Sequence, residues 1–231
     1  MDNRKNTILL TVIAVATLLV AVVGATFAYF TAQGGGTATN NIEVKTEAAA
    51  SSSFSIDKNL AILANMDNFA QGTGETQADT MTGTVEFTAG TGTGAQTEFC
   101  YSATIAWNAA TPSDFVDTGA QQEDLTLTVT KNSGWSGTDY TTKGTEIWTD
   151  KAVTTSAQRA NFTKIPTTLD GTDYIHHMTA SAGTTVREQI LVTLSFNYSG
   201  TVDQTDNAGK TLTGTLTLKQ ETCWALIKSL K

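Results

Sequence analysis

The chain has 231 residues and a net charge of −8, from 14 Lys and Arg against 22 Asp and Glu. This balance argues against nucleic acid as a partner, because phosphate binding needs clustered Lys and Arg. About a fifth of the residues are threonine and only 2 are proline. Because threonine is β-branched and suits a half-exposed strand better than a helix, the composition predicts an all-β protein.

The N-terminus has the anatomy of a secretory signal. The basic pair Arg4-Lys5 precedes an uncharged run over 7–30, which ends on small residues at Thr26 and Ala28. This pattern predicts a signal peptide over 1–28, cut after Ala28. The run is also long enough to span a bilayer, so a retained N-terminal anchor is the alternative.

Both alternatives predict the same location for the rest of the chain. The positively charged flank stays on the cytoplasmic side of the membrane. Residues 31–231 are therefore expected outside the cytoplasm, either secreted or on the cell surface.

Residues 29–53 are predicted to be a flexible N-terminal segment. The stretch 32–39 is rich in glycine and alanine, and 48–53 is a run of alanine and serine. Between them, Ile42 and Val44 alternate with polar residues, as in an extended strand. We take this piece as a candidate donor strand for a neighbouring subunit.

The remaining chain shows apolar and polar residues in alternation, the signature of strands buried on one face. The stretch 60–66 is ambiguous between helix and strand. Turn residues predict reversals at 132–134, 170–171 and 207–209. The expected strands cover 54–57, 82–88, 99–107, 125–130, 145–149, 151–154, 187–198 and 212–218.

Seven to nine short strands of this kind fit a two-sheet antiparallel sandwich. We expect one such domain over 54–221, followed by a C-terminal tail over 222–231. Jelly-roll and immunoglobulin-like topologies both satisfy the pattern.

Two short motifs resemble one family. The leader exit GATFAYFT at 24–31 resembles that of the TasA/camelysin family of Gram-positive bacteria, in which a dedicated signal peptidase cuts just before an aromatic residue, here Tyr29. The stretch DQTDNAGKT at 203–211 looks like a turn in many Firmicute exported proteins with such leaders. The resemblance favours a jelly roll and implies a structural subunit of a biofilm-matrix or surface fibre, with signal peptidase and envelope or matrix components as partners.

The two cysteines, Cys100 and Cys223, are a candidate disulfide. Outside the cytoplasm such a bridge can form and persist. The alternative is two free thiols. The pair alone does not suggest a metal site, because neither cysteine has a second ligand at close spacing in the sequence.

The sequence contains no recognisable catalytic motif. His176 and His177 are neighbours, so on a strand they point to opposite faces, and we expect ordinary surface or loop histidines. Asp203, Asp206 and Asn207 do not match a calcium loop, so a turn bonded to its own backbone is expected there. We therefore predict no enzyme activity, no metal and no cofactor.

Aromatic residues near the expected strand ends raise one alternative function. Such side chains can stack on sugar rings, although packing in the core or rim is the expected role. The two functional hypotheses are thus a self-associating fibre subunit and an anchored monomeric adhesin or carbohydrate-binding module. The aromatic candidates are Trp107, Trp135, Tyr140, Trp148 and Tyr174.

Overall fold

The computed structural model describes residues 49–65, 76–91, 94–119, 124–199 and 201–223. The chain divides into two compact units, and the described residues all belong to the second, Gly36–Lys231. The expected signal at 1–28 and the donor strand with Ile42 and Val44 lie outside the described residues. Within the described part, no helix has the length and apolar character needed to cross a membrane.

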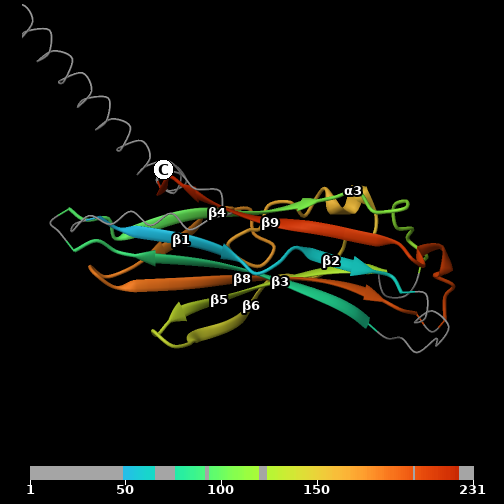
Figure 1. Cartoon of the computed structure of the whole chain (residues 1–231), viewed down its shortest axis with the longest axis horizontal. Coiled ribbons are helices and arrows are strands. Elements are labelled where there is room, and N and C mark those ends of the chain that lie inside the picture. Colours follow the sequence, from blue (N-terminus) through green and yellow to red (C-terminus); the bar gives the residue numbers. More distant parts are fainter. Residues whose placement is uncertain (1–48, 66–75, 92–93, 120–123, 200, 224–231) are drawn as a thin grey trace, which may run out of the picture. The chain divides into compact units, whose positions relative to one another are not determined.

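The described residues form two antiparallel sheets (Figure 1). Among the described residues, one short helix, α3 (Ser156–Arg159), and a 3₁₀ turn, η1 (Thr205–Asn207), interrupt the strands. The five-stranded sheet has the order β1 (Ser51–Ile56), β3 (Thr76–Thr88), β8 (Thr185–Asn197), β5 (Leu125–Trp135) and β6 (Tyr140–Ala152). The four-stranded sheet has the order β2 (Leu60–Leu63), β9 (Thr211–Glu221), β4 (Glu98–Trp107) and β7 (His176–Thr179).

The strand order is that of a jelly roll. With β1 set aside, strands β2 to β9 fall into the orders 2-9-4-7 and 3-8-5-6. The chain crosses between the sheets at every step except the β5–β6 hairpin, which gives two interlocked Greek keys. The expected two-sheet antiparallel sandwich of jelly-roll type is confirmed. In this arrangement β1 is an additional strand on the edge of β3.

Alternation along each strand explains why the sheets stack. In β9, Leu212, Leu216 and Leu218 are buried while the intervening threonines are partly exposed. Burying each such side chain contributes about 1.5–3 kcal/mol. On the outer face, threonine hydroxyls pair across strands, as Thr80 and Thr193 do at 2.8 Å. The many threonines therefore form much of the outer faces of the sheets, and the aliphatic residues form the core.

Gly83 of β3 lies where leucine side chains of the other sheet pack directly against the backbone. A Cβ atom at this position would lie 2.5 Å from Cδ2 of Leu216 and 3.1 Å from Cδ1 of Leu218. We expect Gly83→Val to lower the free energy of unfolding by about 1–3 kcal/mol, because the added methyl groups overpack the core. Urea denaturation measures the change. Thr82→Val, on the outer face of the same strand, should change it by less than about 0.5 kcal/mol; equal effects would contradict the packing argument.

The folded domain begins earlier than expected. Ser51, Ser52 and Ser53, predicted to belong to a loose spacer, form the first half of β1, with Ser51 opposite Thr88. The backbone N–H and C=O groups of β3 can pair with any extended segment. Residues that do not favour strands can therefore still form β1 there. The ambiguous stretch 60–66 contains strand β2 rather than a helix.

The β5–β6 hairpin corrects two further expectations. The predicted turn at 132–134 is part of β5, and the chain reverses at Ser136–Asp139, where the N–H of Ser136 donates to the carbonyl of Asp139. The two short strands expected around Asp150 are one strand, β6, in which Asp150 has φ 46°. The register of β5 against β6 shifts along the hairpin. These irregularities allow turn-forming residues to lie within the two strands.

Candidate functional site

Strand β9 has a long unpaired edge. β2 is only 4 residues long and pairs with Thr211–Gly214, whereas β9 continues to Glu221. No described strand pairs with 215–221 on the β2 side, although β4 pairs with this stretch on the other side. An unpaired edge presents backbone N–H and C=O groups that can accept another strand.

The free edge of β1 lies on the same side of the sandwich. β1 and β2 follow one another along this side, one in each sheet (Figure 1). The β1 sequence SSSFSI carries no charge. Phe54 and Ile56 are only partly buried, and the ring of Phe54 lies 5.8 Å from that of Phe99. This side of the sandwich therefore combines the uncharged edge of β1 with incompletely covered apolar side chains, while the open edge of β9 is uncharged from Thr215 to Leu218 and carries Lys219 and Glu221 at its end.

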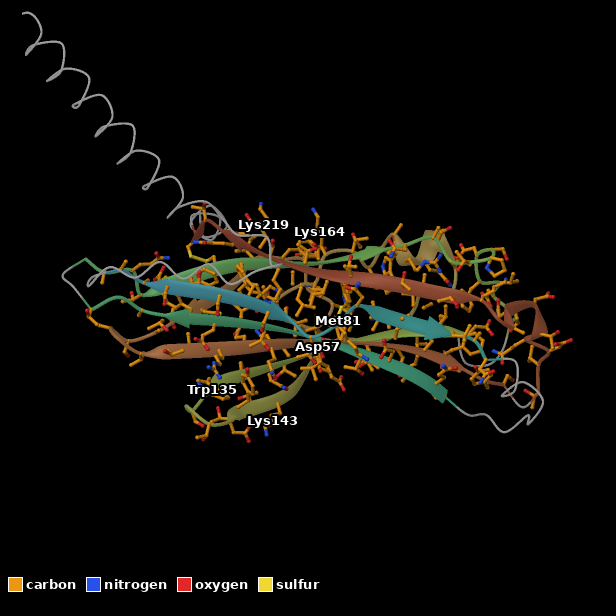
Figure 2. All side chains as sticks on the ribbon, in the orientation of Figure 1. Asp57, Met81, Trp135, Lys143, Lys164 and Lys219 are labelled. Carbon is orange, nitrogen blue, oxygen red and sulfur yellow. A yellow bond between two sulfur atoms is a disulfide. The ribbon has the colours of Figure 1, made fainter. Side chains whose placement is uncertain are left out.

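The opposite edge of the five-stranded sheet is protected. β6 carries Lys143, Glu146, Asp150 and Lys151, and its pairing with β5 is irregular. Figure 2 labels Lys143 of β6 and Trp135 of β5, which both lie in this hairpin. Charges and bulges are the devices with which proteins prevent edge-to-edge pairing. The β6 edge is thus a poor acceptor for an added strand.

The outer flank of β4 is also covered. β7 pairs with its first residues, and the segment 163–165 continues from there. The N–H of Ile105 donates to the carbonyl of Thr163 at 2.8 Å, and the N–H of Ile165 donates to the carbonyl of Ala103 at 2.9 Å. In the described part of the four-stranded sheet, the long open edge is therefore that of β9.

The late turn holds a neighbouring loop in place. Asn207 is fully buried; its Oδ1 accepts the N–H of Val116 at 2.8 Å, and its Nδ2 donates to the carbonyl of Val116 at 2.7 Å. Gln204 donates to Asp124, and Lys210 donates to the carbonyl of Asp114 at 2.6 Å. The stretch 203–211 is therefore a turn just before β9 whose buried polar side chains bond the segment 114–124.

The same turn does not gather its oxygens around a cation. Asp203 accepts hydrogen bonds from the hydroxyl and N–H of Thr205, which lower the pKa of its carboxyl, while Asn207 faces inward. Gly209, at φ 73°, ends the turn. The expected bonding of the turn to its own backbone is present at Asp203, whereas Asn207 bonds the neighbouring loop at Val116 instead.

We expect Asn207→Ala to lower the free energy of unfolding by about 2–4 kcal/mol. The change removes both part-buried hydrogen bonds to Val116, each worth about 0.5–1.5 kcal/mol, and leaves a void in place of the fully buried amide, which adds about 1 kcal/mol. Chemical denaturation provides the measurement. Asp206→Asn, in the same turn but exposed, should stay within about 0.5 kcal/mol of the parent protein. A loss of similar size in both variants would contradict the role given to Asn207.

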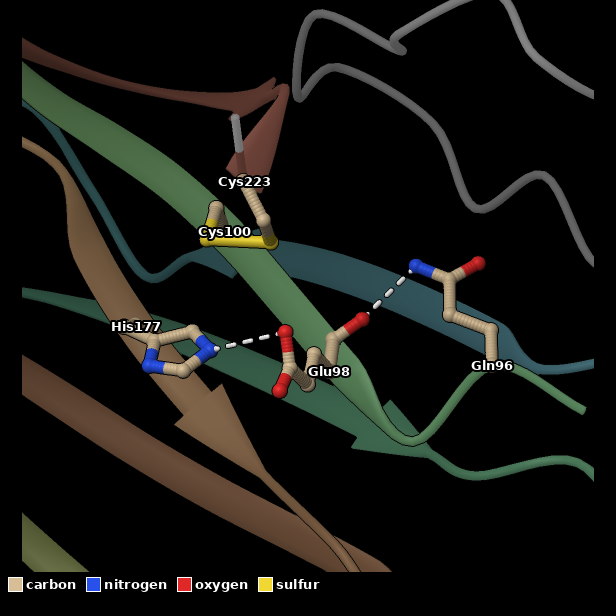
Figure 3. Close-up of a disulfide and its surroundings, with 5 residues drawn as sticks. All are labelled: Gln96, Glu98, Cys100, His177 and Cys223. Carbon is tan, nitrogen blue, oxygen red and sulfur yellow. Dashed lines mark hydrogen bonds and ion pairs between the residues drawn. A yellow bond between two sulfur atoms is a disulfide. The ribbon is translucent and has the colours of Figure 1, made fainter. Parts of the chain in front are cut away.

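The structure joins Cys100 and Cys223 by a disulfide, with a Cα–Cα distance of 5.2 Å (Figure 3). Cys100 lies in β4 between two partner strands, opposite His177 of β7 and Glu221 of β9. The bond fixes the chain just beyond β9 to the outer surface of the four-stranded sheet. It also brings the start of the expected C-terminal tail, 222–223, into the folded domain.

The disulfide has a histidine neighbour that the spacing in the sequence did not reveal. One ligand atom from each of Cys100, His177 and Cys223 lies within 4.8 Å of the others. The Nε2 atom of His177 lies 3.5 Å from Oε2 of Glu98, as Figure 3 shows. The two cysteines therefore have a third candidate ligand nearby in space, although neither has one at close spacing in the sequence.

His176 points the other way and is a core residue. It is buried, its ring stacks on that of Tyr101 at 4.7 Å, and its Nε2 lies 3.2 Å from the carbonyl oxygen of Ile165. Its Nδ1 has no hydrogen-bond partner among the described residues. Burial, with help from the positive charge of Lys131, lowers the pKa of His176 to about 4. The two histidines do face opposite sides, but His176 is not the surface residue expected.

The aromatic candidates do not form one binding platform. Trp148 is 5% exposed, and Trp107 packs against the core and donates its ring N–H to the carbonyl of Phe162 at 3.2 Å. The guanidinium of Arg187 lies over the ring of Trp135, 4.5 Å from its centroid. Tyr140 packs against Trp135, and Tyr174 remains exposed elsewhere in the chain. Packing is the main role of the three tryptophans.

Fold and edges together define a class, a jelly-roll sandwich with an extra edge strand and an open strand edge. Comparison with known proteins adds no closer relationship: no family model, no curated protein and no solved structure matches the chain.

Proposed function

We propose that this protein is an exported structural subunit that associates with copies of itself into a surface or biofilm-matrix fibre. The observation that supports the proposal most strongly is the open edge of β9 beyond Gly214. The family resemblance of the leader and the late turn points to the same function. A structural role also fits the late turn, whose buried Asn207 holds a neighbouring loop in place.

The contact between subunits would be the addition of a strand. Removal of the leader before Tyr29 by signal peptidase frees the segment 29–45. Ile42 and Val44 are two residues apart, as are Leu216 and Leu218 of β9, so they share one face of an added strand. Paired along 215–221 of a neighbour, they extend its inner apolar face.

Repetition of this contact gives a fibre. The donor segment and the acceptor edge are different parts of the subunit, so the contact is heterologous, and its repetition extends into a filament when the rotation between subunits does not close a ring. The proposed location is outside the cell, secreted or attached to the cell surface, where envelope or matrix components are further partners.

Electron microscopy of purified protein tests the proposal. Protein of residues 29–231 should form fibres, whereas protein of residues 46–231 should remain dispersed. Fibres of equal length from both would contradict strand donation by this segment.

Point variants give a matched control. Ile42→Asn with Val44→Asn removes two apolar side chains, each contributing about 1.5–3 kcal/mol when buried, so subunit affinity should fall by more than about 100-fold. Asn41→Ala with Glu43→Gln changes the alternate face and should leave assembly intact. If both pairs assemble equally well, the predicted orientation of the donor strand is wrong.

A further inference from the structure

Four polar side chains converge on the outer surface at one end of the four-stranded sheet. Glu98 and Cys100 are two residues apart in β4 and so share a face. His177 of β7 lies directly opposite Cys100, and Cys223 follows β9 two residues after Glu221, the other partner of Cys100. The register of three strands therefore assembles this group, which we call the cysteine corner.

We propose that the cysteine corner is a redox-controlled site for a zinc-like divalent cation, which Cys100, Cys223 and His177 bind when the disulfide is reduced. Two thiolates and an imidazole are ligands that Zn²⁺ prefers, with water in the fourth position. The described residues offer no other group of three such ligands. Oxidised and metal-bound forms exclude each other, because both use the same two sulfur atoms.

The geometry requires little movement. Tetrahedral Zn²⁺ with bonds of about 2.0–2.3 Å holds its ligand atoms about 3.3–3.8 Å apart. The sulfur and nitrogen atoms already lie within 4.8 Å of one another. His177 is one-third exposed, so an ion can reach the site from solvent. Cys100 is buried and forms the inner side of the site.

Glu98 is a positioning residue in this site. Its carboxylate lies 3.5 Å from Nε2 of His177. A carboxylate that accepts the second ring N–H of a metal-bound histidine holds the imidazole in the required orientation. Figure 3 draws Nδ1 on the side of the ring away from the sulfur atoms, so binding of the metal through Nδ1 requires the ring to rotate about its Cβ–Cγ bond.

The chemical steps balance without any unnamed reagent. A phosphine or dithiol reductant supplies two electrons and is itself oxidised, and the S–S bond becomes two thiols after uptake of two protons. Zn²⁺ then displaces a proton from each thiol and binds both sulfurs. Reoxidation by dissolved oxygen takes two electrons from the two thiolates, forms the S–S bond and releases the ion, while the oxygen takes up two protons and becomes hydrogen peroxide.

The test uses protein of residues 29–231, reduced with a phosphine under exclusion of oxygen and titrated with Zn²⁺ or Co²⁺. The reduced protein should bind one equivalent and show thiolate-to-cobalt charge-transfer absorption, whereas the oxidised protein should show neither. His177→Ala retains both cysteines and should weaken Zn²⁺ binding by at least about 100-fold; Glu98→Gln should weaken it by about tenfold. Glu146→Gln, on the distant β6 edge, is the control and should bind as the parent does.

Three outcomes would overturn the proposal. The first is equal metal binding by reduced and oxidised protein. The second is unchanged affinity in His177→Ala, which would mean that the thiols act without the imidazole. The third is loss of the β-sheet circular dichroism signal on reduction, because the site would then not exist in the reduced chain.

Discussion

Replacement of both cysteines by alanine is expected to lower the free energy of unfolding by about 5 kcal/mol. The bond between Cys100 and Cys223 spans 123 positions, so it closes a long loop in the unfolded chain. For a loop of this length, the lost entropy of the unfolded state corresponds to about 5 kcal/mol at 25 °C. Because domains are stable by only about 5–15 kcal/mol, the variant should be marginal. Urea denaturation without reductant measures the difference.

A control variant separates the effect of losing the disulfide from the effect of a substitution close to Cys223. Thr222→Ala changes an exposed neighbour of Cys223 and should alter the free energy by less than about 0.5 kcal/mol. Reduction of the parent protein should reproduce the loss seen in the double variant. A difference below about 1 kcal/mol between oxidised and reduced protein would show that the bridge does not stabilise the fold.

Stability should also fall as the pH is lowered from 6.5 towards 4. His176 has a folded-state pKa of about 4 against an ordinary value of 6.5, because burial disfavours its charged form. Above pH 6.5 the residue is neutral in both states. Below it, the unfolded chain binds a proton that the folded chain does not, so about 3 kcal/mol is lost by pH 4. Denaturation at a series of pH values measures the slope.

The surroundings of His176 support this assignment. The positive charge of Lys131 disfavours protonation of His176. The negative charge of Asp173 favours it, but too weakly to offset the effect of burial. Tyr101, which stacks on the ring, donates its hydroxyl to Glu188 at 2.7 Å and so offers His176 no charge. His176→Phe should flatten the pH dependence in this window, while the exposed His177→Ala should keep it. An unchanged slope in His176→Phe would refute the assignment.

Carboxyl groups contribute in a lower pH range. Burial tends to raise the pKa of Asp79, but its hydrogen bonds with Lys58 and the N–H of Ala61 lower it below 3.8. Asp114 behaves alike, since Arg159 and the N–H of Ser156 outweigh burial. A carboxyl with a lowered pKa begins to lose its stabilising effect near pH 5 and loses most of it below its unfolded-state pKa of 3.8. The loss between pH 6.5 and about 5 therefore reports mainly on His176.

The strands that the sequence predicted best are those with one buried apolar face and one more exposed polar face. Around 99–107, 125–130, 187–198 and 212–218, buried aliphatic residues alternate with threonine, and the structure has β4, β5, β8 and β9 there. Period-2 alternation of this kind follows from the geometry of a half-buried strand, so it is visible in one segment alone. The jelly-roll order needed the family resemblance, because strand order depends on contacts between distant segments.

Edges and pairings were less predictable for the same reason. Ser51–Ser53 belong to a strand because β3 offers them backbone partners, not because of their side chains. Cys100 and Cys223 could be matched since they were the only two, but the place of His177 depends on the register of β4 with β7. The inward position of Asn207 likewise depends on the loop that it holds, which comes from another part of the chain.

The most direct test of the proposed assembly is site-specific photo-cross-linking from the open edge of β9. A photoreactive side chain at Thr217 in protein of residues 29–231, mixed with an isotope-labelled copy, should cross-link to residues 29–48 of another subunit. The same group at Glu146 of β6 should give no such product. Cross-links from Thr217 that stay within one chain, or cross-linking from both positions alike, would contradict assembly by strand addition at β9.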